Sequence, residues 1–188
     1  MLKIINECQK YVEITGFRNT WIDNADIWIK TVQPRKHERT AIQFFDANLI
    51  ATWEHLYFAV LNALSAFATR KNISRSIAME TMLYASAQRQ IRKAIELVGV
   101  KHGMINVAVA IIGENPALVE TTFADIKKRF GKPTDESVVE LSENKAECIC
   151  RAFKISEEEI RATMQKGGLE QAIVGLVIER VALLSTRL

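Results

Sequence analysis

Residues 103–113, GMINVAVAIIG, contain an apolar run rich in valine and isoleucine with a glycine at each end. A run of this length between turn residues is typical of a strand buried on both faces, so we expect Met104 to Ile112 at the centre of a sheet. Proline is tolerated in the first turn of a helix. Pro116 therefore predicts a helix that starts there, reaches about Phe130 and ends at Gly131 and Pro133.

Further strands are expected on both sides of this run. Val12 to Phe17 alternates apolar and polar residues, and residues 41–45 form a second short apolar stretch that ends at Asp46. Residues 137–141, SVVEL, are interpreted as an edge strand. Residues 24–40, with a proline and a charged run from 35 to 39, predict a short helix and a loop.

Helices are expected in the remaining segments. Apolar residues recur at helical spacing from about 48 to 69, and small residues on the other face would let another element approach closely. Ser74 can cap a second helix that stops at Gly99, and a break near residues 86–88 is compatible with the sequence. Two or three helices close the chain, one of them opening with the capping box of Ser156 and Glu159 and the last following residues 167–168. We predict a single α+β domain over residues 1–188, with a small, mainly antiparallel sheet of about four strands covered by helices.

The composition indicates a globular protein rather than a membrane or disordered one. The 188 residues are 48% hydrophobic and 25% charged, and the longest stretch without an acid or base, His55 to Thr69, is shorter than a membrane span requires. A charge occurs too early at the N-terminus for a secretory signal, and the three cysteines do not form an even disulfide set. We expect a soluble, cytoplasmic protein.

The motifs of common catalytic and cofactor sites are not found. The sequence has neither of the two common glycine-rich nucleotide fingerprints and no nucleophile elbow. The three histidines lie in different elements, and Cys148 and Cys150 have poor spacing for one metal ion on a helix. We therefore expect no cofactor, no metal and a binding role, although an active site without a known motif stays open.

One short segment concentrates positive charge. Residues 70–93 have a net charge of +5, whereas residues 1–69 are neutral and residues 94–188 have a net charge of −2. Such a local field suits a phosphate-bearing partner. On one continuous helix, four cations would align opposite isoleucines 77, 91 and 95, namely Lys71, Arg75, Arg89 and Lys93. A break in the helix would weaken this alignment. The alternative is a solvated helix face balanced by acids from elsewhere in the fold.

Two further features require a partner inside or outside the chain. Glu80 projects onto the apolar side of the expected helix, so we predict an arginine or a helix terminus beside it if it is buried; the alternative is a surface residue. The last helix is apolar over more than half its circumference, with Ile178 and Ala182 opposite its main apolar face. It is therefore either enclosed within the fold or covered by another protein.

These features together resemble one known family. The residues that carry the resemblance are Asn72-Ile73-Ser74, Glu80, the run ASAQRQI at 85–91 with its continuation to Val100, the strand at 105–112, and FKIS at 153–156 before the last helix. This pattern is similar to the small non-catalytic subunit of the KEOPS/EKC complex, the PRPK-binding protein (TPRKB) family, in its archaeal form.

The resemblance implies a specific function without chemistry of its own. Members of this family bind the amino-terminal lobe of a small atypical kinase/ATPase, and their complex installs threonylcarbamoyl on adenosine 37 of tRNA. The subunit recruits tRNA through its single-stranded CCA 3′ end.

The resemblance also implies two sets of site residues. The residues expected to contact tRNA are Lys71, Asn72, Ser74, Arg75, Arg89, Gln90, Arg92 and Lys93. The residues expected to contact the kinase are Ala59, Ala63, Ala66, Leu176, Leu183 and Leu184. Tyr84 is the only aromatic residue within 72–100, so base stacking would fall to arginine planes or to another segment.

Two alternatives stay open at this point. The chain could form a homo-oligomeric RNA-binding protein in which the last helix pairs with itself, or it could be a small RNA-processing enzyme.

Overall fold

The central apolar run forms the middle of a four-stranded antiparallel sheet. The computed structural model describes residues 2–33, 39–164 and 168–186. Its strand order is β1-β2-β4-β3, in which β4 pairs with both β2 and β3. The bounds are β1 (Leu2–Ile5), β2 (Lys10–Ile22), β3 (Thr40–Asp46) and β4 (Gly103–Gly113). The expected central strand is confirmed.

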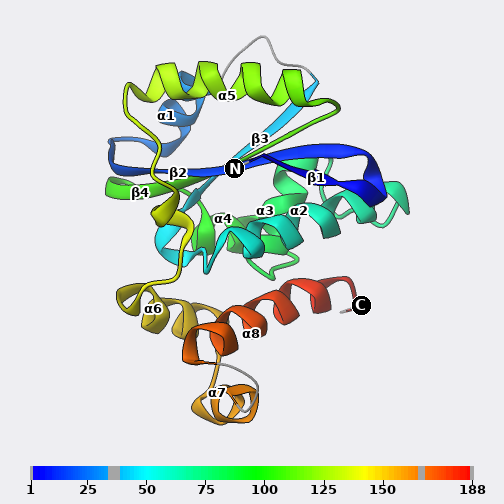
Figure 1. Cartoon of the computed structure of the whole chain (residues 1–188), viewed down its shortest axis with the longest axis vertical. Helices are drawn as coiled ribbons and strands as arrows, with labels where there is room; N and C mark the ends of the chain where they lie inside the picture. Colours follow the sequence, from blue (N-terminus) through cyan, green and yellow to red (C-terminus); the bar gives the residue numbers. More distant parts are fainter. Residues whose placement is uncertain (1, 34–38, 165–167, 187–188) are drawn as a thin grey trace.

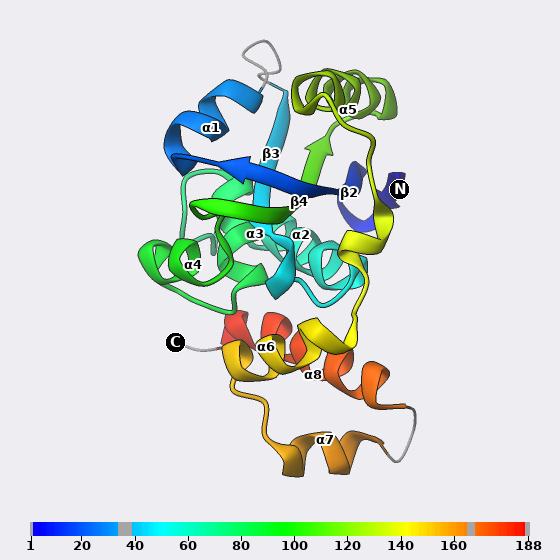
Figure 2. The same ribbon diagram turned by 90° about the vertical axis from the view of Figure 1, so that its left-hand side faces the viewer.

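Helices cover both faces of the sheet and add a further layer beyond one of them (Figures 1 and 2). One face carries α1 (Ala25–Val32) and α5 (Pro116–Phe130). The other carries α2 (Trp53–Ala68), α3 (Ile77–Ala85) and α4 (Ile91–Val98). The further layer consists of α6 (Glu143–Phe153), α7 (Glu157–Thr163) and α8 (Leu169–Leu183). This arrangement confirms the predicted α+β class. No helix in the described part of the chain is both long and apolar enough to span a membrane.

Local capping chemistry explains why several helix boundaries fall where they were expected. The Asn115 side chain accepts the Leu118 N–H at the start of α5, and Gly131 ends this helix at a φ of 63°. Ser156 and Glu159 form the reciprocal capping box at the start of α7.

The predicted edge strand at 137–141 is wrong. Residues Glu136–Val139 form a short 3-10 helix, η3, because the Asp135 carboxylate accepts the Ser137 N–H and turns the chain. Val138 packs so closely on β2 that a Cβ at Gly16 would lie 2.6 Å from it, so only glycine fits at this point of the strand. The edge next to β2 is instead occupied by β1, which the sequence analysis did not predict.

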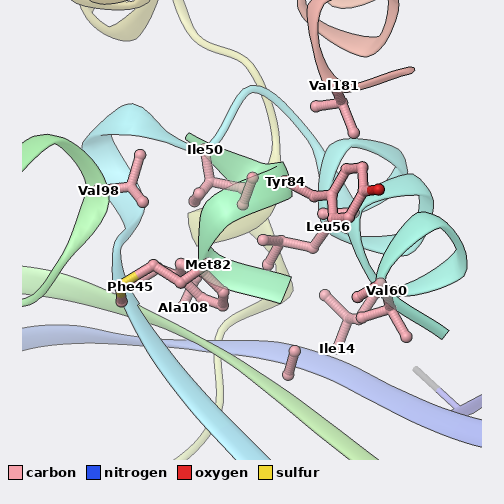
Figure 3. Close-up of a cluster of buried hydrophobic side chains, with 14 of the residues drawn as sticks. Ile14, Phe45, Ile50, Leu56, Val60, Met82, Tyr84, Val98, Ala108 and Val181 are labelled. Atoms are coloured by element: carbon pink, nitrogen blue, oxygen red, sulfur yellow. The ribbon is translucent and has the colours of Figure 1, made fainter. Parts of the chain in front are cut away.

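The side chains of β4 alternate between two hydrophobic cores. Val107, Val109 and Ile111 face the α1 and α5 side. Ala108 and Ala110 face the α2 and α3 side, where Val181 of α8 joins the same core (Figure 3). The small β4 side chains on this second side leave room for large ones such as Phe45 and Met82.

The wide apolar face of the last helix is enclosed within the fold. Val181 and Leu184 belong to the main core, and Ile173, Leu176 and Val177 pack with α6 in a third cluster. The internal alternative therefore holds for this face.

His55, a residue of α2, connects the end of α3 to α6. Its ring is fully buried; Nδ1 accepts the Ala51 N–H at 3.2 Å, and Nε2 lies 2.8 Å from the Ala85 carbonyl oxygen, to which it donates in this tautomer. The ring also meets Phe153 of α6 edge-on. Burial lowers the pKa of His55 to about 4, so the ring is neutral at pH 7.

We predict that His55 makes the fold sensitive to acid. The unfolded chain binds a proton on His55 near pH 6.5, whereas the native chain binds it only near pH 4. As the pH falls between these values, the contribution of His55 to the free energy of unfolding therefore decreases by about 1.4 kcal/mol per pH unit. His55→Gln should unfold more readily than the wild type at pH 7, and the difference should shrink toward pH 4 in denaturant titrations. His102→Gln, at an exposed histidine, should have the same stability as the wild type at each pH. A difference in stability between His55→Gln and the wild type that stays constant with pH would contradict the role of His55.

Candidate functional site

The loop before α3 is organised around the carboxylate of Glu80. Glu80 is fully buried and accepts the N–H groups of Ile73, at 3.1 Å from each carboxylate oxygen, and of Ser74, at 2.7 Å. The prediction of a partnered, buried Glu80 is thus confirmed, but the partner is neither an arginine nor a helix terminus. Loop amides take that place because residues 73–74 fold back over the first turn of α3.

Two of the expected RNA contacts lie inside this loop. The Asn72 side-chain amide donates to the Ser74 carbonyl, and the Ser74 hydroxyl donates to the Ser76 carbonyl. Ser74 is buried, and Ser76, rather than Ser74, caps α3 through the Met79 N–H. Asn72 and Ser74 therefore shape the loop that carries Lys71 and Arg75.

The charged segment is not one helix: the break considered near residues 86–88 is present, so the alignment described for a continuous helix does not form. A Schellman motif ends α3: Ala87 adopts the left-handed conformation, its N–H bonds to the Tyr84 carbonyl, and the Gln88 N–H bonds to the Leu83 carbonyl. The chain restarts as α4 at Ile91. Lys71 and Arg75 consequently lie at one end of α3 and Arg89 and Lys93 at the other, about 13 Å apart along the helix axis.

Arg89, Gln90 and Lys93 line a cleft of about 620 Å³ between this second end of α3 and the C-terminal helices. The remaining lining residues are Ser86, Ala87, Gln88, Ala152, Phe153, Lys154, Glu159, Glu179, Arg180, Leu183 and Leu184. Figure 2 shows how α6 and α8 lie below α4 on this side of the molecule. The opposite wall, from residues 152–154, 179–180 and 183–184, was not predicted as part of this site.

The other predicted cations lie outside this cleft. Arg75 lines a separate cleft of about 330 Å³ with Lys10, Arg39 and Glu114, in which Glu114 pairs with both Lys10 and Arg39. Arg92 is one residue from Lys93, but its guanidinium pairs with Glu96 four residues on and its side chain is 91% exposed.

The 620 Å³ cleft has an excess of positive charge. Four cations, namely Arg89, Lys93, Lys154 and Arg180, line it together with two carboxylates, Glu159 and Glu179. An anionic ligand therefore meets a net charge of +2.

Arg180 builds the floor of the cleft rather than its rim. Its side chain is 15% exposed, and its guanidinium donates to the carbonyls of Phe153 and Lys154 and to Glu159 Oε1 at 2.7 Å. The Ser156 N–H and this guanidinium hold the pKa of Glu159 below its usual range. This interaction ties α6, α7 and α8 together.

The cleft also offers apolar surface. Phe153 and Leu183 line it, and Leu183 is 40% exposed. Phe153 is itself only 6% exposed, so most of the accessible apolar surface of the cleft comes from Leu183.

The structure separates the six residues expected to contact the kinase. Ala59, Ala63 and Ala66 are buried on α2 in the main core of the same chain. Leu176 and Leu184 are buried too, and Leu183 faces the 620 Å³ cleft. The solvent-facing sides of α2 and α8 carry other residues than these six, namely Phe58, Leu61, Gly175, Ile178 and Ala182.

Residues with metal-binding or redox potential do not form a site in the described part of the chain. The three cysteines are free thiols, and no group of three or more His, Cys, Asp and Glu residues within the described ranges could hold a metal ion. His37 and most of the charged run at 35–39 lie outside the described residues.

Two comparisons bear on the identity of this chain. A family model described as kinase binding protein CGI-121 matches residues 20–184. The regulatory protein Cgi121 of the archaeon Methanocaldococcus jannaschii is 38% identical over 113 residues, which are 60% of this chain and 70% of that protein.

We predict that the loop carrying Lys71 and Arg75 depends on the charge of Glu80. Glu80→Gln turns one acceptor oxygen into a donor that faces the loop amides, which should cost about 1–3 kcal/mol of the free energy of unfolding. Glu96→Gln, at an exposed glutamate on α4, should change it by less than about 0.5 kcal/mol. Denaturant unfolding of both variants checks this. Equal unfolding midpoints for Glu80→Gln and the wild type would refute the role of Glu80.

Proposed function

The chain belongs to the CGI-121 family of kinase-binding proteins, and from this we propose that it is a non-catalytic accessory subunit of a KEOPS-type complex. In this role it binds the small atypical kinase/ATPase and recruits tRNA for threonylcarbamoylation through the single-stranded CCA 3′ end. The observation that carries the RNA part is the cationic cleft between α4 and the C-terminal helices.

The cleft has the groups that an unpaired RNA end requires. Phosphates of a single strand need cations along their path, which Arg89, Lys93 and Lys154 supply from two walls. Unstacked bases need apolar surface and hydrogen-bonding edges, which Leu183 and Gln90 provide. Of the eight residues expected to contact tRNA, we therefore give Arg89, Gln90 and Lys93 the leading role.

The outward face of α2 and α8 suits a protein partner. Its apolar residues are Phe58 and Leu61 from α2 and Gly175, Ile178 and Ala182 from α8. The two helices are in contact, and Phe58 is 36% exposed. Exposed apolar residues that adjoin across two packed helices are typical of protein interfaces. We place the kinase contact on this face, because the alanines of α2 are buried within the fold.

The RNA proposal predicts a sharp difference between two neighbouring residues. Lys93→Glu should weaken tRNA binding about tenfold and reduce its salt dependence, because it reverses a charge inside the cleft. Arg92→Glu should have a much smaller effect, since Arg92 points away from the cleft and is already paired. A gel shift with full-length tRNA at two salt concentrations measures both variants.

A substrate control distinguishes the 3′ end from the body of the tRNA. Trimming the CCA end should weaken wild-type binding and remove the difference between the two variants. If trimmed tRNA binds as well as intact tRNA, the cleft does not hold the 3′ end.

The kinase proposal predicts that a charge on the α2 and α8 face disrupts the complex. Ile178→Glu should reduce co-purification with the kinase subunit at least tenfold, because it introduces a charge into an apolar contact. Ile27→Glu, on α1 at the other side of the sheet and 65% exposed, is the matched control. Retention of the kinase by Ile178→Glu would exclude this face.

Mass measurement of the isolated wild-type chain tests the alternative of a homo-oligomer, since a stable dimer that does not bind the kinase would favour self-association.

A further inference from the structure

A third cleft, of about 540 Å³, lies where the start of α2 faces α8, on the side of α8 opposite the cationic cleft. Its lining comes from three parts of the chain and comprises Thr52, Trp53, Glu54, Glu140, Glu170, Gln171, Val174, Gly175 and Ile178. It is continuous with the outward face of α2 and α8, because Gly175 and Ile178 belong to both.

The charge of this cleft is uniformly negative. Glu54 comes from α2, Glu140 from the segment before α6, and Glu170 from α8, and no lysine or arginine is among the lining residues. Two cations from outside the lining contact residues of this cleft. Lys145 donates to the backbone carbonyls of Val138 and Glu140, and the Lys3 ammonium lies 4.3 Å from the centre of the Trp53 ring.

Thr52 provides an independent indication of a missing partner. It is 8% exposed, and its Oγ1 is one of two buried side-chain atoms in the described ranges without a hydrogen-bond partner. Thr52 is the N-cap residue of α2, yet its side chain accepts no N–H of the first turn. Buried hydroxyls are nearly always hydrogen-bonded, so an unpaired one in a cleft wall suits a ligand that brings an N–H donor.

The walls favour a cation on a long apolar stem. Trp53, Val174 and Ile178 form apolar walls, and a Cβ at Gly175 would meet no atom within 4 Å, so the cleft is open there. Arginine and lysine side chains bury their methylene stems on such surface and place the charge at its rim. An arginine has in addition several N–H donors and a plane that stacks on tryptophan.

We infer that this acidic cleft receives an arginine side chain of the kinase partner, with the guanidinium between the three glutamates and an N–H directed to Thr52. The inference rests on the proposed kinase binding and makes it more specific: the apolar face supplies contact area, and the acidic cleft at its end selects a basic residue of the kinase. Charge complementarity of this kind governs specificity and association rate.

The test removes two of the three carboxylates of the cleft without changing its shape. The double variant Glu54→Gln with Glu170→Gln, in the full chain, should bind the kinase about tenfold more weakly than the wild type at low salt, and the gap should narrow at high salt. The matched control neutralises Glu157 and Glu158, two exposed glutamates of α7, and should leave kinase affinity unchanged. Binding of tRNA by the double variant should not weaken, because the cationic cleft is untouched.

A third variant tests the role of the hydroxyl. Thr52→Val replaces the unpaired hydroxyl by a methyl group of similar size, so the isolated chain should be at least as stable as the wild type while kinase affinity falls. A loss of stability would show that the hydroxyl is used within the fold and would overturn its part in the site.

The outcomes separate this inference from the function on which it rests. Equal kinase affinity of the double variant and the wild type at every salt concentration would overturn the inference alone. Absence of kinase binding by the wild type would overturn the proposed function and the inference together. If the double variant instead dissociates a dimer of the isolated chain, the occupant is a second copy and the kinase assignment is wrong.

Discussion

A single neutral imidazole determines where the two walls of the cationic cleft meet. His55 binds the Ala51 N–H and the Ala85 carbonyl, and its ring packs against Phe153. Ala85 is the last residue of α3, so this hydrogen bond sets the point from which the loop carrying Arg89 departs. Phe153 begins the opposite wall. Because the ring is fully buried, it must stay uncharged to hold both contacts, and the arrangement of the cleft depends on that condition.

The C-terminal helices then have two different surfaces. Toward α4, residues 152–154, 179–180 and 183–184 complete a cleft with excess positive charge. Toward the start of α2, Glu170 and Ile178 border an acidic and apolar one. Arg180 supports this division from inside, since its guanidinium joins the end of α6 to Glu159 at the start of α7. Opposite charges on two sides of one small layer mean that the proposed RNA and kinase contacts would not compete for the same residues.

Local sequence signals sufficed for most elements but not for the assembly of the clefts. The valine and isoleucine run of β4, Pro116 and the capping box at Ser156 each determine a boundary through short-range chemistry, and all three predictions are confirmed. The strand predicted at 137–141 failed because the Asp135 side chain turns the chain and Val138 packs on a strand over a hundred residues away. The cations of 70–93 were found by composition, but their grouping depends on the left-handed Ala87, a residue type that rarely adopts this conformation. Lys154 and Phe153 carried no local signal of binding, because only packing brings α6 to Arg89.

The central claim is that an unpaired RNA 3′ end lies between α4 and the C-terminal helices. Titration of a short single-stranded oligonucleotide ending in CCA, followed by backbone amide NMR of the full chain, tests it directly. The account predicts chemical-shift changes on both walls at once, at residues 88–93 and at 152–154, with residues around Arg75 unaffected. Changes confined to the loop at 71–76, or to the outward face of α2, would contradict it.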